Sequence, residues 1–234
     1  MATVKIQDVL NKVETILQDD TNVRWTAGEL LGWANDAYRE IVMARPDLNT
    51  TTGTMTCVEG TRQILTTTFA PHALRLIDIV RNMAATSNKG AVRLISRKIL
   101  DDQKRDWHNV ASKSVNIEYY MFDPRLPKDF LVYPPATTAA QLEVVYSSVP
   151  TGHTVSGNTV PDEVIKIDDS WANCMIDYIL YRCYSKDAEY TANTQRAASH
   201  YQAMLTSLGA KTQADMAVSP QEGAPRPPTT NRDM

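Results

Sequence analysis

Apolar residues recur in two helical patterns over the first 49 residues. The first pattern runs from Val4 to Gln18, where apolar positions one and three residues apart line one side of a helix. The second begins at Thr26–Glu29, which fits a capping box, and it ends before Pro46, which disfavours helical geometry at the preceding residue. A short polar link joins the two patterns, so we predict that residues 1–49 form a helical hairpin. The two apolar stripes consist of Ile6, Val9, Leu10, Val13, Ile16 and Leu17, and of Leu30, Leu31, Ala34, Ala37, Tyr38, Ile41 and Val42.

Strand patterns replace the helical ones from residue 50. β-Branched residues on both sides of a turn at Glu59–Thr61 predict two short strands. The runs 74–81 and 91–95, joined by the turn Ser87–Gly90, predict a longer hairpin. A short helix is then expected, with Ser96 as its cap and Trp107 at its end.

Three further strands are expected between this short helix and residue 146. Apolar residues alternate at 115–121 and again at 142–146, and the run Phe130–Tyr133 is typical of a buried strand. We therefore predict that residues 50–159 form an inserted antiparallel β module, a small sandwich.

Helical spacing returns after the loop 152–158. Pro161–Glu163 suits the first turn of a helix, because proline is tolerated there and acidic residues favour the positive end of the helix dipole. A last helix is expected to end at Gly209, since glycine is favoured just beyond a helix end. The first of these helices carries a packing seam with steps of four and three residues, namely Ile167, Trp171, Cys174, Tyr178 and Tyr181.

The last segment, 210–234, differs in composition from the rest of the chain. It holds four prolines, and Val218 is its only aliphatic residue larger than alanine. Such a segment buries too little apolar surface to offset its own ordering, so we expect an extended tail. The predicted fold class is α+β: a helical bundle from residues 1–49 and 160–209, the β-rich insertion 50–159, and an extended C-terminal tail at 210–234.

Composition narrows the class of protein. The chain has 234 residues, 43% of them hydrophobic, and a net charge of -3, which allows a stable core and excludes wholesale disorder. No apolar run approaches the ~20 residues of a membrane helix, and the N-terminus lacks a secretory signal pattern. We therefore expect a soluble intracellular protein with reduced thiols at Cys57, Cys174 and Cys183. The 24 basic and 27 acidic residues give no electrostatic reason for tight nucleic-acid binding.

Motifs for catalysis or metal binding are few. The four histidines are scattered, and Cys174 and Cys183 lie nine residues apart, on opposite faces of a helix. The acidic pairs Asp19–Asp20, Asp101–Asp102 and Asp168–Asp169 are sequence neighbours, which diverge on a helix and make poor acid–base pairs. We predict no catalytic residue, no metal site and no cofactor.

Several longer motifs occur in a characteristic order along the chain. They are Arg24–Thr26, Glu29–Leu31, Trp33–Ile41, Arg45–Asp47, Asp129–Pro135 and Asp177–Tyr190. The motifs follow an N-terminal helix. With these motifs in this order, the chain resembles the head-to-tail adaptor (connector) proteins of short-tailed bacteriophages. The resemblance covers residues 4–209, and its motifs are structural rather than catalytic.

The resemblance implies a structural protein of the virion, made in the host cytoplasm. It implies a homo-oligomeric ring, typically of twelve copies, seated beneath the portal protein at the capsid vertex. Such a ring extends the DNA channel, lets packaged DNA pass without sequence-specific binding, and joins the capsid to tail nozzle and fibre proteins. The acidic net charge suits a conduit along which DNA must slide.

The same resemblance supplies candidate contact residues. Helices are expected to pack between neighbouring copies, and the C-terminal tail is expected to thread onto the portal. Two alternative functions stay open: a peptidoglycan-cleaving tail component, and a nucleic-acid-binding module that uses the basic cluster Arg93, Arg97, Lys98, Lys104 and Arg105. The candidates for inter-subunit packing are Trp171, Tyr178, Tyr181 and Tyr201, and those for portal docking are Val218, Pro220, Pro225, Arg226, Pro227, Pro228 and Arg232.

Overall fold

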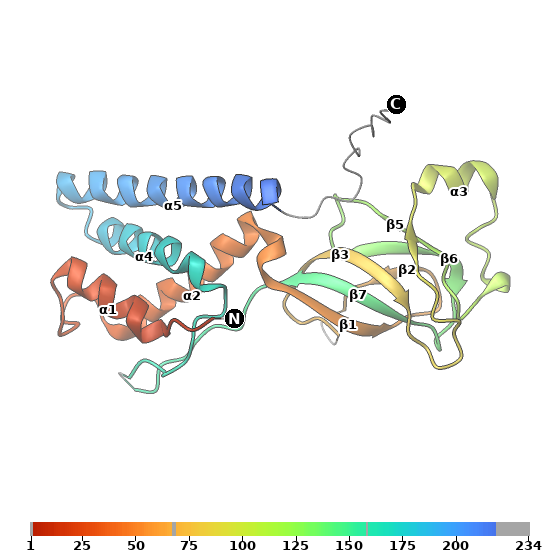
Figure 1. Cartoon of the computed structure of the whole chain (residues 1–234), viewed down its shortest axis with the longest axis horizontal. Helices are drawn as coiled ribbons and strands as arrows, with labels where there is room; N and C mark the ends of the chain where they lie inside the picture. Colours follow the sequence, from red (N-terminus) through yellow and green to blue (C-terminus); the bar gives the residue numbers. More distant parts are fainter. Residues whose placement is uncertain (1, 67–68, 158, 219–234) are drawn as a thin grey trace, which may run out of the picture.

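The longer helices gather in one half of the molecule, and the strands gather in the other together with one short helix (Figure 1). The computed structural model describes residues 2–66, 69–157 and 159–218. This arrangement confirms the predicted α+β fold class. The helices are α1 (Ile6–Leu17), α2 (Ala27–Ala44), α3 (Arg97–Gln103), α4 (Ala172–Lys186) and α5 (Thr191–Val218), and the strands are β1 (Thr50–Thr56), β2 (Gly60–Ile64), β3 (Ala73–Asn82), β4 (Arg93–Leu94), β5 (Tyr119–Phe122), β6 (Asp129–Ala136) and β7 (Gln141–Ser148).

The two N-terminal helices form where the sequence predicts them. The capping box of α2 is complete, because the Thr26 hydroxyl accepts a hydrogen bond from the Glu29 amide while the Glu29 carboxylate accepts one from the Thr26 amide. α2 ends at Ala44, and a short 3-10 turn begins at Pro46. Local signals are sufficient to define both helices.

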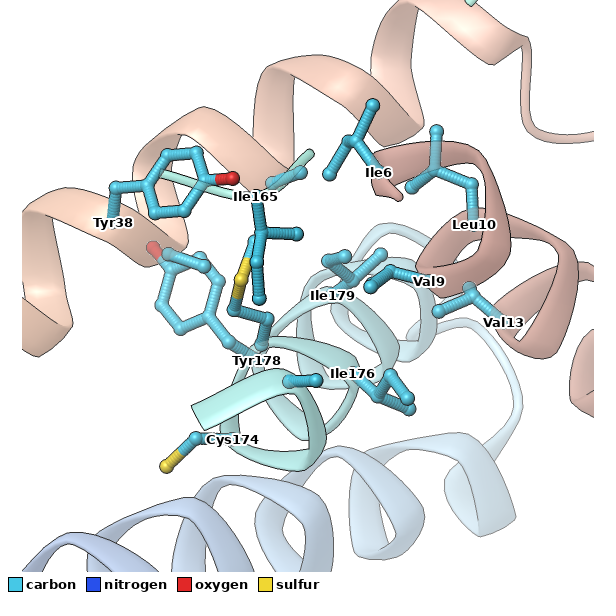
Figure 2. Packing of buried hydrophobic residues seen from close by; sticks show 14 of the residues in the cluster. Ile6, Val9, Leu10, Val13, Tyr38, Ile165, Cys174, Ile176, Tyr178 and Ile179 are labelled. Atoms are coloured by element: carbon cyan, nitrogen blue, oxygen red, sulfur yellow. The ribbon is translucent and has the colours of Figure 1, made fainter. Parts of the chain in front are cut away.

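α4 is the central helix of the helical half. α1, α2 and α5 all pack against it, whereas α1 and α2 make few direct contacts with each other. The two predicted N-terminal helices are thus held together mainly by a helix that follows more than 120 residues later, not by packing directly as a hairpin. In Figure 2 the side chains of Val9 and Val13 on α1 point towards Ile179 on α4. All three are fully buried, and they belong to one continuous hydrophobic core.

The predicted start of α4 at Pro161 is wrong. Residues 161–168 are not helical, and Val164 forms an antiparallel bridge with Lys5. The backbone groups of this segment therefore pair with the N-terminal segment, which competes with helix formation. The helix begins after Asp168, whose carboxylate accepts a hydrogen bond from the Ser170 amide and caps a 3-10 turn that leads into α4.

The predicted helix end at Gly209 is also wrong, because α5 continues to Val218. Glycine inside a helix costs only about 1 kcal/mol relative to alanine, and the residues that follow it are mainly strong helix formers such as alanine, lysine, glutamine and methionine. The segment predicted as extended tail is thus helical from 210 to 218. The rest of that segment, 219–234, lies outside the described residues.

The strands form two sheets that share one hydrophobic core. The first sheet has the order β1-β7-β3 and the second the order β2-β6-β5-β4, and all neighbours are antiparallel except β4 and β5. Buried residues from both sheets, such as Met55, Leu76 and Val144 in the first and Phe130 and Val132 in the second, belong to the same core cluster. The module is therefore a small sandwich, as predicted.

Strand partners differ from those that the sequence indicates. β3 and β4, predicted as a hairpin, lie in different sheets and meet at an isolated bridge between Arg81 and Ala91. The buried Asn82 explains this corner, because its side chain bonds to Gly90 of the connecting loop and to Ile117 beside the second sheet.

The short helix α3 also departs from the prediction. It ends at Gln103 rather than at Trp107, and the hydroxyl of Ser96 makes no capping hydrogen bond. Trp107 is instead buried against Leu100 and Met121, in a small core on the outer side of the second sheet.

Two adjacent stretches of chain connect the halves. The chain enters the β half at Asn49–Thr50 and leaves it at Ser148–Val149, and the Asn49 side chain donates a hydrogen bond to the Ser148 carbonyl (2.7 Å). Leu74 of β3 packs against the helical core across this junction. In the described part of the chain no helix is long and apolar enough to cross a membrane.

Candidate assembly surfaces

α5 presents an unusually uncharged surface. This 28-residue helix is about 42 Å long and packs on α4 through the buried side chains of Ala197, Met204 and Leu208. Between residues 191 and 210, Arg196 is the only Lys, Arg, Asp or Glu residue, and His200 is the only histidine. The outer face of α5 consists of the exposed residues Gln195, Ala198, Ser199, Gln202, Thr206 and Gly209.

Such a face is suited to contact with another protein surface. Solvent-exposed helix faces usually carry charged residues, as α2 does with its exposed Glu40 and its Arg39–Asp36 ion pair. Charged residues are depleted in the centre of protein interfaces, and small side chains let another helix approach closely. The outer face of α5 has both properties.

The four predicted inter-subunit residues do not share one environment. Trp171 and Tyr178 are 2% and 5% exposed, so they pack in the core of their own chain. Tyr181 is half-buried and Tyr201 is 39% exposed, and their ring centroids lie 4.9 Å apart where α4 meets α5. Of the four residues, Tyr181 and Tyr201 therefore retain surface for a neighbouring copy.

A second polar contact joins α4 and α5 beside these tyrosines. The Nδ1 atom of His200 lies 3.0 Å from the Asp177 carboxylate, and the ring of Tyr184 stacks on His200 with centroids 5.8 Å apart. The sequence gives no sign of this contact, because the spacing of the histidines does not show that His200 reaches Asp177, 23 residues earlier on α4.

A shallow groove runs between α1 and α4. Its volume is about 630 Å³, and it is open to solvent. Ile16, which is 49% exposed, and Ile176 give it an apolar part. The remaining lining residues are Asn11, Lys12, Thr15, Asn173 and Asp177.

The far end of the helical half exposes two large hydrophobic side chains. Val23 is 83% exposed in the α1–α2 turn, and Tyr190 is 65% exposed in the α4–α5 turn. An Arg24–Asp187 ion pair holds these turns together. Asp19 shapes the first turn by accepting hydrogen bonds from three backbone amides, that of Trp25 foremost, and these bonds lower the pKa of its carboxyl.

A buried polar network attaches the segment 150–166 to α2. The Tyr38 hydroxyl lies 3.0 Å from Nε2 of His153, whose Nδ1 lies 2.8 Å from the Glu163 carboxylate. The Asn35 side chain bonds to both the amide and the carbonyl of His153, and the Lys166 amide donates to the Tyr38 hydroxyl. No sequence pattern predicts this network, since its members are up to 128 residues apart.

Burial sets the protonation of this network. It raises the pKa of Tyr38 to about 12 and lowers the pKa of His153. Hydrogen bonds from Lys166 and then His153 lower the pKa of the Glu163 carboxyl. Near neutral pH the Tyr38 hydroxyl therefore donates to Nε2 of a neutral His153, whose Nδ1–H donates to Glu163.

The acidic pairs that were weighed as catalytic candidates make structural contacts. Asp101 accepts a hydrogen bond from Nε1 of Trp107 and forms an ion pair with Arg97. Asp169 accepts hydrogen bonds from the amides of Thr3 and Val4. Each of these contacts has a role in the fold.

The cysteine thiols are buried, and the potential metal ligands are dispersed in the described part of the chain. All three cysteines are buried, and burial raises the pKa of the Cys57 and Cys183 thiols to about 12. Within residues 2–66, 69–157 and 159–218, no three His, Cys, Asp or Glu side chains come together in a way that could hold a metal ion.

The remaining candidates lie at two places. The basic cluster surrounds α3 on the β half, where Arg97 pairs with Asp101 and the ammonium of Lys104 bonds to the Tyr133 hydroxyl. Arg93, Lys98 and Arg105 are exposed, and nothing in their contacts tests nucleic-acid binding. Val218 is the last residue of α5, and the other six portal-docking candidates lie outside the described residues.

The sequence was compared with curated proteins and with models of protein families. A search of curated proteins found no match. A model of the SU10 adaptor protein family matches residues 4–225, a range that includes both halves of the molecule and all of α5. The match confirms the expectation of a phage adaptor at the level of the family. The chain belongs to the SU10 adaptor protein family, a family of structural phage adaptors.

Proposed function

We propose that this chain is a structural head-to-tail adaptor of a short-tailed phage. Twelve copies form a ring beneath the portal protein, extend the DNA channel, and join the capsid to tail nozzle and fibre proteins. Packaged DNA passes through this ring without sequence-specific binding. The role consists of oligomerisation and docking and needs no catalysis.

The outer face of α5 is the observation that carries this proposal. Between Gln195 and Gly209 this face is exposed and uncharged, with the exposed Arg196 at its margin, and in the described part of the chain the helix packs on α4. A helix of this kind gains buried surface when a second copy covers it.

A ring also needs a second, different surface, because each copy contacts the next in a head-to-tail manner. The groove between α1 and α4 is a suitable partner surface, since Ile16 gives it exposed apolar area. We infer that the outer face of α5 in one copy packs over this groove in the next. Tyr181 and Tyr201 then lie beside this contact and add to its buried area.

The C-terminal tail is the proposed portal contact. Its support is compositional: the part beyond α5, residues 219–234, holds all four prolines, which give it little tendency to pack on its own chain. Limited proteolysis tests this part. We expect cleavage between Val218 and Arg232 in the free chain and protection once portal rings are added, whereas equal cleavage in both samples would refute portal docking by the tail.

A single charge on the outer face of α5 tests ring formation. Gln202→Asp places a carboxylate at every copy-to-copy contact, so we expect at least a tenfold loss of ring assembled on portal. Gln103→Asp makes the same change at an exposed position of α3 and is expected to assemble like wild type. Normal assembly of Gln202→Asp would refute the assigned surface.

A further inference from the structure

The two sheets have four edge strands, and three of these are protected against further pairing. β3 carries Arg75, Asp78 and Arg81, and its pairing with β7 shifts register three times. β2 shifts register between Gly60 and Arg62, and β4 is only two residues long. Charges, irregular register and short length are the features that stop an edge strand from accepting another strand.

β1 has none of these protective features. Its sequence, Thr50–Thr56, contains no charged residue and no proline, and all seven residues pair with β7 in one unbroken register. In the part of the chain that the structure describes, β7 is its strand partner. Among the described residues, this regular, uncharged edge of seven residues therefore has no strand partner on its other side.

The register shows which backbone groups face this open side. The Cys57 amide donates to the carbonyl of Ala140, the residue directly opposite it (2.9 Å), and antiparallel hydrogen-bonded pairs alternate along a ladder. The odd-numbered residues of β1 therefore bond to β7. The Gln141 carbonyl agrees with this assignment, because it accepts from Met83, on the side of β7 away from β1.

The groups that face the open side all belong to threonines. The amides and carbonyls of Thr50, Thr52, Thr54 and Thr56 point away from β7, and the side chains of these four residues are exposed. Threonine favours strands, and its short uncharged side chain leaves the backbone accessible. The edge thus offers four donors and four acceptors at the spacing of a β-strand.

We propose that β1 accepts an extended strand of about seven residues from a different protein of the virion, a contact that rests on the proposed adaptor function. The incoming strand is uncharged opposite the threonines, because β1 offers no counter-charge. It has no proline at positions whose amide must reach β1.

Pairing between the edge strands of two copies is not expected in a ring. The three other edges of each copy are protected, so self-pairing would have to join β1 to β1 about a two-fold axis. All copies in a ring point the same way, which leaves no such axis between neighbours. In such a ring, neighbouring copies therefore do not pair through their β1 edges, which favours a strand from a different protein.

Hydrogen exchange measured amide by amide tests this contact in the full-length chain and in purified virions. We expect the amides of Thr50, Thr52, Thr54 and Thr56 to exchange at least tenfold more slowly in virions. The amides of Thr51, Gly53 and Met55 already bond to β7 and are expected to be protected in both samples.

Two outcomes would overturn the proposal. Fast exchange of the four threonine amides in virions that contain the adaptor ring would refute strand addition, while the ring itself, measured by mass, would still support the adaptor function. Protection of the same amides in oligomers made from this chain alone would show that a second copy fills the edge.

A pair of substitutions at one position gives an independent check. Thr54→Pro removes an amide that faces the open edge, so it leaves the bonds to β7 in place, and edge strands tolerate proline. Thr54→Val keeps the amide and removes only the hydroxyl. We expect proline, but not valine, to abolish protection of the remaining edge amides in virions, and equal protection in both variants would refute the assigned hydrogen bonds.

Discussion

Replacing Tyr38 with phenylalanine isolates the contribution of the buried polar network. Tyr38 is 0% exposed, and its ring packs in the helical core, so Tyr38→Phe keeps the packing and removes one oxygen atom. That oxygen makes two hydrogen bonds, with His153 Nε2 at 3.0 Å and with the Lys166 amide at 3.2 Å. The substitution therefore leaves a buried acceptor and a part-buried donor without their partner.

The expected loss of stability follows from these two groups. A buried polar group left without a partner costs about 1–3 kcal/mol, and the Lys166 amide is only part-buried, so we expect a total of about 3 kcal/mol. For a chain of this size, 1 kcal/mol corresponds to roughly 2–4 °C in Tm. The midpoint of thermal unfolding should therefore fall by roughly 6–12 °C.

Urea unfolding followed by tryptophan fluorescence measures this effect. Trp25 and Trp171 are buried in the helical core and report on the half that contains Tyr38. Tyr190→Phe is the matched control, because that ring is 65% exposed. A change of less than about 0.5 kcal/mol in Tyr38→Phe, the size expected of a surface substitution, would refute the importance of the network.

Three further predictions concern stability. Burial lowers the pKa of His153, so just below the ordinary histidine pKa of 6.5 the unfolded chain binds a proton that the folded chain does not. Between pH 7 and 5.5 the free energy of unfolding should therefore fall with falling pH, by at most about 1.4 kcal/mol per pH unit. His153→Gln should flatten this slope in urea titrations. Thr26→Ala removes the cap of α2 and should cost about 1 kcal/mol in calorimetry, whereas an unchanged Tm would contradict the capping box. Gly209→Ala should stabilise the chain by about 1 kcal/mol, because Gly209 lies inside α5 with open space where a Cβ would lie; destabilisation would mean that the helix ends there.

Local signals predicted the elements whose boundaries depend on nearby residues. The apolar stripes and the capping box define α1 and α2, a short apolar run locates β6, and alternating residues locate β7. The start of α4 was not predictable in this way, because the pairing of Val164 with Lys5 involves residues about 160 positions apart. Strand partners are equally non-local, since an alternating pattern shows that a strand has a buried face but not which strand lies beside it.

The candidate surfaces likewise include features that the sequence pattern predicts and features that only the structure shows. Helical spacing grouped Tyr178 and Tyr181 on one packing seam, but it did not reveal that Tyr178 is buried while Tyr201 is exposed. The open edge of β1 was invisible in the sequence, because a run of threonines is typical of any strand. Only the order of strands in the sheet shows that this run lies at an edge.

The solution mass of the full-length chain, alone and mixed with portal rings, tests the adaptor proposal most directly. One copy has a mass of 26.1 kDa, so a ring of twelve would add about 313 kDa to the portal. We predict that this gain appears when portal is present. A chain that stays at 26.1 kDa and leaves the mass of the portal ring unchanged would contradict the proposal.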